Sequence, residues 1–149
     1  MLVRLLYASR ATDSVSQEEL LKILSQSKEH NPESGITGVL CSSGQIFLQV
    51  LEGGRMQVNA LYNHIAADPR HKDVVILSYE EISERKFASW SMGQVNLERI
   101  NPSLLLKYSE CAALDPYCVP GKASMALVDE LMATASIMGQ ANVSMSGTR

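Results

Sequence analysis

One stretch of the sequence decides the fold: Ile46-Phe47-Leu48-Gln49-Val50-Leu51-Glu52-Gly53-Gly54. Its β-branched and aromatic residues are typical of a strand, and the two glycines end it. A second apolar run, residues 36–42, precedes it, and Ser43-Gly44 lies between the two runs. Two strand-like runs around a short glycine-containing turn predict a β-hairpin.

The segments on either side of the hairpin complete an alternation of strands and helices. Ser16, with Glu19 three residues later, predicts the capped start of a helix, and Asn31-Pro32 predicts its end. The apolar patterns predict further strands at residues 2–9, 74–79 and 90–95 and a second helix over residues 58–65. This βαββαββ order predicts an α+β fold, a ferredoxin-like sheet with two helices on one face.

The pattern changes near residue 99, so we expect a domain at residues 1–98 and a C-terminal helical extension at residues 99–149. A short helix is expected over residues 102–113, with Asn101 as its cap and proline at its first position. The last dozen residues, rich in Ser and Gly, are expected to be disordered. A second tail helix is predicted by a stripe of residues at helical spacing: Ser124, Leu127, Val128, Leu131, Ala135 and Met138.

Composition narrows the class of protein. The chain has 149 residues and a formal net charge of -3, and its basic residues are scattered, which argues against nucleic acid as a partner. No stretch reaches the roughly 20 apolar residues of a membrane span, so a soluble, cytoplasmic protein without a membrane partner is expected. Of the cysteines, Cys41 is expected in the core, while Cys111 and Cys118 could be free thiols or form a regulatory disulfide, and their role stays open.

Common catalytic and metal-binding patterns are missing from the sequence. His30, His64 and His71 do not have metal-ligand spacing, and no cysteine pair does, so no metal site is expected. The sequence contains neither the G-x-S-x-G turn of a hydrolase nor a G-x-G-x-x-G loop after the first strand.

Two polar residues, Tyr7 and Gln49, lie where apolar residues are expected. Tyr7 shares a strand face with Val3 and Leu5, and Gln49 shares one with its neighbours two positions away. If the helices cover these faces, the phenol and the amide are buried and need partners, because an unpaired buried polar group costs roughly 1–3 kcal/mol. They could bond to each other or to a backbone group, or they could serve a ligand.

At these residues the sequence resembles the BLUF family of blue-light sensors. The matching motifs occur in the family's order from residue 2 to residue 95: Leu5-Leu6-Tyr7-Ala8-Ser9, Asn31 with Gly35-Ile36-Thr37-Gly38, Phe47-Leu48-Gln49-Val50-Leu51-Glu52-Gly53, Asp68-Pro69-Arg70-His71 and Trp90-Ser91-Met92. The resemblance is to the short, stand-alone kind of BLUF protein. It implies a photoreceptor rather than an enzyme, with non-covalently bound FAD whose ring lies between the two helices above the sheet.

The resemblance also implies roles for particular residues. Asn31 would hydrogen-bond the pyrimidine edge of the flavin, or would only end the helix. Lys28 and His64 would neighbour the ribityl-diphosphate chain, or would lie on solvated helix faces. The implied cofactor-binding set is Tyr7, Ser9, Ile23, Leu24, Lys28, Asn31, Phe47, Gln49, His64 and Ile65.

By the same resemblance, Tyr7, Gln49, Trp90 and Met92 are photoactive. Tyr7 would give the excited flavin an electron and then a proton, and Gln49 would rotate or tautomerise, which shifts the absorption to the red. In a regular strand Trp90 and Met92 share one face, whereas a bulge would let them exchange places at the flavin. The signal would pass through the fifth strand and the C-terminal helices to a separate effector protein or to homo-oligomerisation.

Other classes remain open on the sequence alone. The alternative is a ferredoxin-like small-molecule-binding module or enzyme without photochemistry, in which Tyr7 and Gln49 serve other chemistry. A purely structural interaction domain is a third possibility. The colour of the purified protein separates them, because a flavin carrier is yellow.

Overall fold

The computed structural model describes residues 1–13, 15–25, 34–134 and 138–140. The predicted order of strands and helices is confirmed over the first 96 residues, and further elements follow it. In chain order they are β1 (Leu2–Ala11), α1 (Gln17–Ser25), β2 (Thr37–Ser43), β3 (Ile46–Gly54), α3 (Arg55–Ala66), β4 (His71–Ile82), β5 (Trp90–Asn96), the 3-10 turn Leu97–Arg99, α4 (Pro102–Tyr108), α5 (Gly121–Ala133) and β6 (Met138–Gln140).

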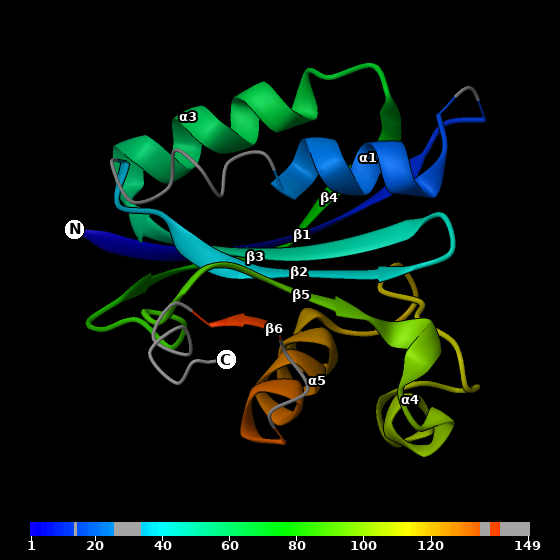
Figure 1. The fold of residues 1–149 in the computed structure, drawn as a ribbon. Coiled ribbons are helices and arrows are strands. Elements are labelled where there is room, and N and C mark those ends of the chain that lie inside the picture. Colours follow the sequence, from blue (N-terminus) through cyan, green and yellow to red (C-terminus); the bar gives the residue numbers. More distant parts are fainter. Residues whose placement is uncertain (14, 26–33, 135–137, 141–149) are drawn as a thin grey trace.

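The strands form one mixed sheet in the order β4-β1-β3-β2-β5-β6. The pairs β1–β3, β1–β4, β2–β3 and β5–β6 are antiparallel, whereas β2 and β5 run parallel. Helices α1 and α3 cover one face, and α4 and α5 lie on the other (Figure 1). The predicted ferredoxin-like arrangement, with two helices on one face, is therefore confirmed.

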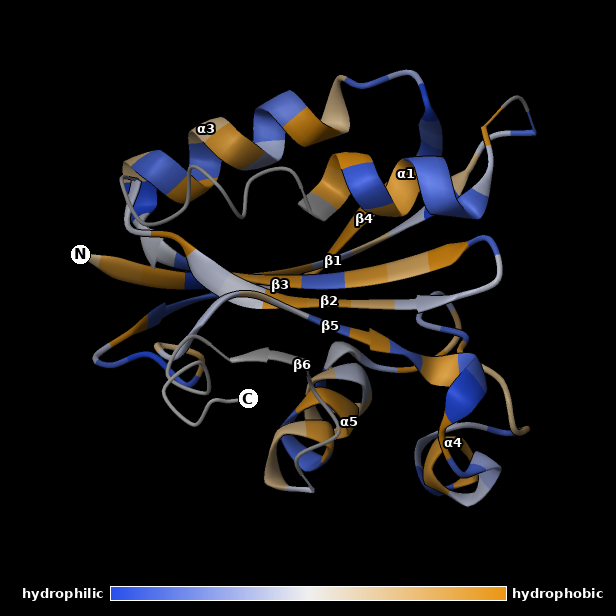
Figure 2. Ribbon diagram, viewed as in Figure 1, coloured by the Kyte–Doolittle hydropathy of each residue, from blue (hydrophilic) through white to orange (hydrophobic). Residues whose placement is uncertain are grey.

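The central strands are buried on both faces, because a helical layer lies on each side of them. In β3 every residue from Phe47 to Gly53 is buried, so the strand is apolar along most of its length rather than alternating. Figure 2 shows the hydrophobic colour over much of β2 and β3, interrupted in β3 by a hydrophilic segment. The hairpin turn is Gly44-Gln45, where Gly44 has a φ of +58° that a residue with a side chain rarely adopts.

Each face of the sheet has its own hydrophobic core. The core under α1 and α3 contains Val3, Leu5, Tyr7, Phe47 and Leu51 from the sheet, together with Leu20, Leu24, Val58 and Ile65 from the helices. The core on the other face contains Leu6, Leu48 and Val50, covered by Leu105 of α4 and Leu127, Val128 and Leu131 of α5. We call these the upper core and the lower core.

The N-terminal cap of α1 is as predicted. The Glu19 main-chain N–H donates to Ser16 Oγ at 3.1 Å, and Val15 is buried in the upper core, as expected of a hydrophobic staple. The predicted end of this helix at Asn31-Pro32 lies outside the described residues.

In the tail, Asn101 caps α4 as predicted, with its side chain accepting from the Ser103 N–H at 3.0 Å. Helix α4 ends at Tyr108, earlier than predicted. The placement of Met138 on the second tail helix is wrong, because α5 ends at Ala133 and Met138 begins β6, which pairs with β5. Disorder was predicted for the last dozen residues, but the first three of these form β6; the last nine lie outside the described residues. In the described part of the chain, none of the helices is long and apolar enough to cross a membrane.

Candidate functional site

The centre of the site is a hydrogen bond between two neighbouring strands. Tyr7 of β1 lies directly opposite Gln49 of β3, and both side chains are fully buried in the sheet face under α1 and α3. The Tyr7 hydroxyl donates to Gln49 Oε1. The predictions that these groups are buried beneath the helices, and that they can bond to each other, are both confirmed.

Met92 of β5 contacts the other end of the same amide. Gln49 Nε2 donates to Met92 Sδ at 3.3 Å, and Met92 is fully buried on the same side of the sheet. The amide is thus held between a phenol and a thioether. A thioether sulfur is a weak acceptor, so this second hydrogen bond is much weaker than the first.

The phenol is neutral in this environment. Burial away from water, and secondarily the nearby Tyr62, raise the pKa of Tyr7 far above its usual value. The two tyrosine rings meet edge to face, with centroids 5.5 Å apart. Tyr7 therefore keeps its proton and acts as a hydrogen-bond donor at any physiological pH.

Two buried polar atoms on this face have no hydrogen-bond partner among the described residues: Ser9 Oγ and His71 Nδ1. Ser9 follows Tyr7 by two positions on β1, and His71 pairs with Ala11 of the same strand. The other ring nitrogen of His71, Nε2, lies 2.6 Å from the Ile65 carbonyl oxygen, which can only accept, so Nε2 donates there. A bound molecule with polar groups would satisfy both atoms, so this face fits a cofactor that is partly polar.

The apolar residues expected to wall the site divide into two groups. Leu24 and Ile65 are buried in the upper core beside Phe47. Ile23 is half-buried, and His64 is exposed on α3. Lys28 and Asn31 lie outside the described residues.

Trp90 does not share a face with Met92, so of the two alternatives left open by the sequence the regular strand does not apply, and the structure fits the irregular, bulged one. Trp90 packs in the lower core against Phe87, with ring centroids 5.8 Å apart, whereas Met92 lies in the upper core. Strand β2 pairs with β5 only from Gly93 to Asn96, and the β5–β6 pairing is irregular between Trp90 and Gln94. Before Gly93, β5 has no pairing with β2 that would fix which face each side chain points to. At this irregular start of β5, Met92 contacts Gln49 and Trp90 packs on the other face.

His71 was missed as a site residue, although it belongs to a motif that the sequence resemblance used. The available signal was its position directly after Asp68-Pro69-Arg70. Those residues form a local turn, in which the side-chain hydrogen bond from Arg70 lowers the pKa of Asp68 to about 2. Strand β4 begins directly after this turn at His71, whose ring is buried against the end of α3.

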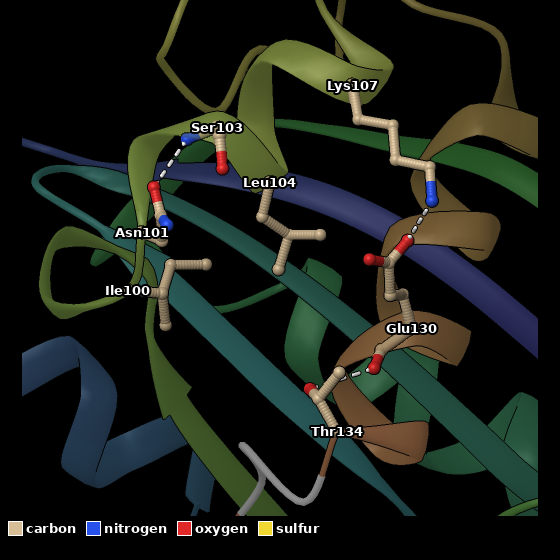
Figure 3. A pocket seen from close by; sticks show the side chains of 7 residues that line it. All are labelled: Ile100, Asn101, Ser103, Leu104, Lys107, Glu130 and Thr134. Carbon is tan, nitrogen blue, oxygen red and sulfur yellow. Dashed lines mark hydrogen bonds and ion pairs between the residues drawn. The ribbon is translucent and has the colours of Figure 1, made fainter.

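A hollow of about 360 Å³ lies on the opposite side of the molecule, between α4 and α5 (Figure 3). An ion pair at its rim joins Lys107 and Glu130 at 2.8 Å. Because the hollow lies beyond the lower core, it is separate from the Tyr7–Gln49 site. Its lining mixes apolar and polar side chains: Ile100, Asn101, Ser103, Leu104, Lys107, Glu130 and Thr134.

The fold and this site together define a ferredoxin-like domain that holds a hydrogen-bonded polar pair in the apolar core under α1 and α3. The family model for BLUF, "Sensors of blue-light using FAD", matches residues 2–93. The chain belongs to the BLUF family, and FAD is the cofactor of that family.

Similar proteins agree with this assignment. The "Blue light- and temperature-regulated antirepressor BluF" of Escherichia coli (strain K12) is 34% identical over 92 residues, which are 62% of this chain and 23% of the relative. Among solved structures, the "BlsA photo-activated state" has 31% identity and a TM-score of 0.76, covering 89% of this chain and 95% of that one. The "BlrB - a BLUF protein, dark state structure" has 30% identity and a TM-score of 0.74, covering 90% and 96%.

Proposed function

We propose that this chain is a blue-light receptor in which Gln49 is the group that changes with light. The observation that carries the proposal is the position of its amide, held between the Tyr7 hydroxyl and Met92 Sδ in a fully buried setting. Bound FAD would absorb the blue light, and its excited flavin would be a strong oxidant. The reaction consumes no substrate, so the chain acts as a sensor and not as an enzyme.

The proposed cofactor site lies under α1 and α3. Ser9 and His71 support it, because each has a buried polar atom that lacks a partner among the described residues. Asn31, Lys28 and His64 remain proposed contacts to the polar parts of FAD. The proposed apolar walls are Ile23, Leu24, Phe47 and Ile65, three of which are buried in the upper core.

The response follows from what the two ends of the Gln49 amide can do. In the state described, Oε1 accepts from Tyr7 and Nε2 donates to Met92. If the amide turns over, Nε2 faces the Tyr7 oxygen and can donate to it, while Oε1 faces the sulfur. A thioether has no proton to donate, so the hydrogen bond to Met92 is lost. The turned amide therefore releases β5 from β3 at this point.

We infer that β5 carries the signal to the tail. Trp90, two residues before Met92, packs in the lower core with residues of α4 and α5. The proposed output is a change in these helices that alters docking of a separate effector protein or self-association. The division into a flavin-binding domain at residues 1–98 and a tail at residues 99–149 stays a prediction, as does the cytoplasmic location.

The test is an absorption spectrum of the purified full chain, taken in the dark, after brief blue illumination and during recovery. We expect a structured flavin band that moves slightly to the red and returns in darkness. A colourless protein that takes up no added FAD would contradict the proposal, and so would a flavin band that bleaches without shifting.

A further inference from the structure

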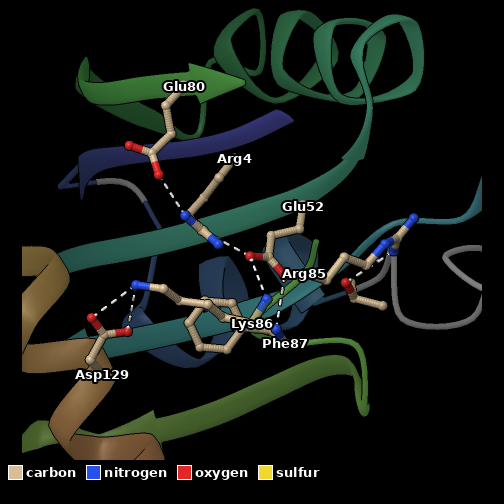
Figure 4. A network of polar contacts seen from close by, with 8 residues as sticks. Arg4, Glu52, Glu80, Arg85, Lys86, Phe87 and Asp129 are labelled. Carbon is tan, nitrogen blue, oxygen red and sulfur yellow. Dashed lines mark hydrogen bonds and ion pairs between the residues drawn. The ribbon is translucent and has the colours of Figure 1, made fainter. Parts of the chain in front are cut away.

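The lower face of the sheet contains a buried ion pair that the photoactive site does not use. Arg4 of β1 lies directly opposite Glu52 of β3, and Arg4 Nε donates to Glu52 Oε2 at 2.7 Å (Figure 4). The Glu52 side chain is fully buried and that of Arg4 is 6% exposed. Charges at this depth are costly unless they are paired and fully hydrogen-bonded.

The Glu52 carboxylate also holds the main chain of a loop. The loop between β4 and β5, residues 83–89, donates the Lys86 N–H to Oε2 at 3.0 Å and the Phe87 N–H to Oε1 at 2.8 Å. Both carboxylate oxygens are therefore used, and the set of donors comprises one guanidinium and two amides. We call Arg4, Glu52 and these two N–H groups the loop clamp.

The clamped loop leads directly into the strand that touches Gln49. Phe87 packs on Trp90, and the Trp90 N–H donates to the Phe87 carbonyl oxygen at 3.1 Å. Met92 follows two residues later. The position of the loop thus sets where β5 begins, and through it the 3.3 Å contact from Gln49 Nε2 to Met92 Sδ.

The same loop also touches the tail. Lys86 Nζ lies 3.1 Å from a carboxylate oxygen of Asp129 on α5. This pair is on the surface and contributes little to stability, but it joins the loop to a helix of the tail. One segment of seven residues is therefore fixed to β3 by Glu52, to β5 by chain connection and to α5 by Lys86.

We propose that Glu52 is a positioning residue for signal output. It fixes the β4–β5 loop, so that a change at Met92 is passed to Trp90 and α5 and not absorbed by a loose loop. The inference rests on the proposed function, since it concerns how the light response of Gln49 leaves the site. Glu52 lies on the same strand as Gln49, three residues later and on the opposite face, and contacts neither Tyr7 nor Met92 among the described residues.

The main test variant is Glu52→Gln in the FAD-loaded full chain. An amide has only one acceptor oxygen, so at least one of the donors now bonded to Glu52 loses its partner. The matched control is Glu80→Gln, because Glu80 is the other, exposed partner of Arg4, whereas the two loop N–H groups of the clamp bond to Glu52. Three quantities are measured: the red shift of the flavin band, the light-minus-dark fluorescence of Trp90, which is the chain's single tryptophan, and amide hydrogen exchange of residues 83–89 and α5.

We expect Glu52→Gln to keep the red shift but to lose most of the light-dependent change in Trp90 fluorescence and in α5 exchange. In the dark, exchange of residues 83–89 should be faster by about tenfold or more, the factor for losing a hydrogen bond to a charged group. Glu80→Gln should behave like the wild type in all three measurements. An undiminished light-dependent change in Glu52→Gln, with the loop still protected in the dark, would overturn the inference.

The dark exchange measurement separates this inference from the proposed function. If the wild type shows no red shift, the proposed function fails. Faster dark exchange of the loop in Glu52→Gln would still support the loop clamp. Unchanged dark exchange of the loop in this variant would still overturn the clamp. If Glu52→Gln does not fold, the surface variant Asp129→Asn decides. It should keep the red shift and the Trp90 change but lose the light-dependent change in α5 exchange, and an unchanged α5 response would overturn the relay.

Discussion

Gln49 and Glu52 lie three residues apart on β3, on opposite faces of one sheet, and they are held in opposite ways. Gln49 is a neutral amide whose two contacts are a phenol and a weakly accepting thioether. Glu52 is a buried carboxylate with one guanidinium and two main-chain N–H donors at 2.7–3.0 Å.

The difference indicates which of the two can move. An amide can present its donor and acceptor ends in exchanged positions, and here the exchange reverses the direction of the hydrogen bond with Tyr7 and removes the weak contact to Met92. A buried carboxylate cannot release any of its donors without leaving charge unpaired in an apolar setting. Under the proposed function, the upper face holds the part of the sheet that responds and the lower face holds the part that stays fixed.

The largest expected effect is on the upper face and is a complete loss of response. Tyr7→Phe and Gln49→Leu should each still bind FAD, because the new side chains are apolar and similar in size, yet show no light-induced red shift. The measurement is the light-minus-dark absorption spectrum. Tyr62→Phe is the control, since its ring contacts Tyr7 without hydrogen-bonding to Gln49. A normal shift in either test variant would show that the amide contact is not the responding group.

The lower face should instead dominate stability. Arg4→Ala leaves the buried Glu52 carboxylate without its guanidinium, and the free energy of unfolding should fall by about 3–5 kcal/mol in urea titrations. Arg55→Ala, which removes the exposed pair with Glu81, should lower the free energy of unfolding far less, because solvent and salt screen an exposed ion pair. Equal losses in the two variants would mean that Glu52 is not as firmly held as its contacts indicate.

A smaller effect is expected where the tail approaches the sheet. A Cβ added at Gly121, the first residue of α5, would lie 2.6 Å from the Leu77 main-chain oxygen of β4. Gly121→Ala should therefore shift α5 and lower the free energy of unfolding by about 1–3 kcal/mol, the usual range for overpacking. Lys122→Ala, next in the helix, is the control. If Gly121→Ala is as stable as the control, then α5 does not depend on this close approach.

The smallest expected effect is the pH dependence that comes from Tyr7. Its folded-state pKa is raised above the ordinary value of 10.0, so between those two pKa values the unfolded chain loses a proton that the folded chain keeps. This contribution is fully present below about pH 10 and is lost as the pH rises further, by at most about 1.4 kcal/mol per pH unit. Urea titrations at pH 8 and 11 should show a smaller decline for Tyr7→Phe than for the wild type. Identical declines would mean that Tyr7 ionises normally in the folded chain.

The upper face could be predicted from sequence because its pattern is local. The strand period of two places Tyr7 on the same face as Val3 and Leu5, and the structure places Tyr7 and Gln49 under α1 and α3. The faces of Trp90 and Met92 could not be predicted in this way, because β5 is irregular before Gly93, where the pairing with β2 begins. Strand β6 has only three residues, too few for any periodic pattern.

The buried ion pair on the lower face could not be predicted from the sequence, for a different reason. Charged residues in a strand ordinarily indicate a solvated face, and nothing near Arg4 or Glu52 suggests that both are buried. They are 48 positions apart, so only the register of β1 against β3 brings them together. The loop is held through its main-chain N–H groups, for example that of Lys86, 34 positions after Glu52. Because every residue except proline has such a group, no residue type in the loop could predict this contact.

The most direct test of the central claim is an infrared light-minus-dark difference spectrum of the FAD-loaded chain, with and without ¹³C label in the glutamine side-chain carbonyl. The contrast between the two faces requires that the Gln49 amide changes its hydrogen bonding with light. We expect a reversible carbonyl band that shifts with the label in the wild type and disappears in Gln49→Leu. A difference spectrum that the label leaves unchanged would contradict the claim, because the responding group would then lie elsewhere.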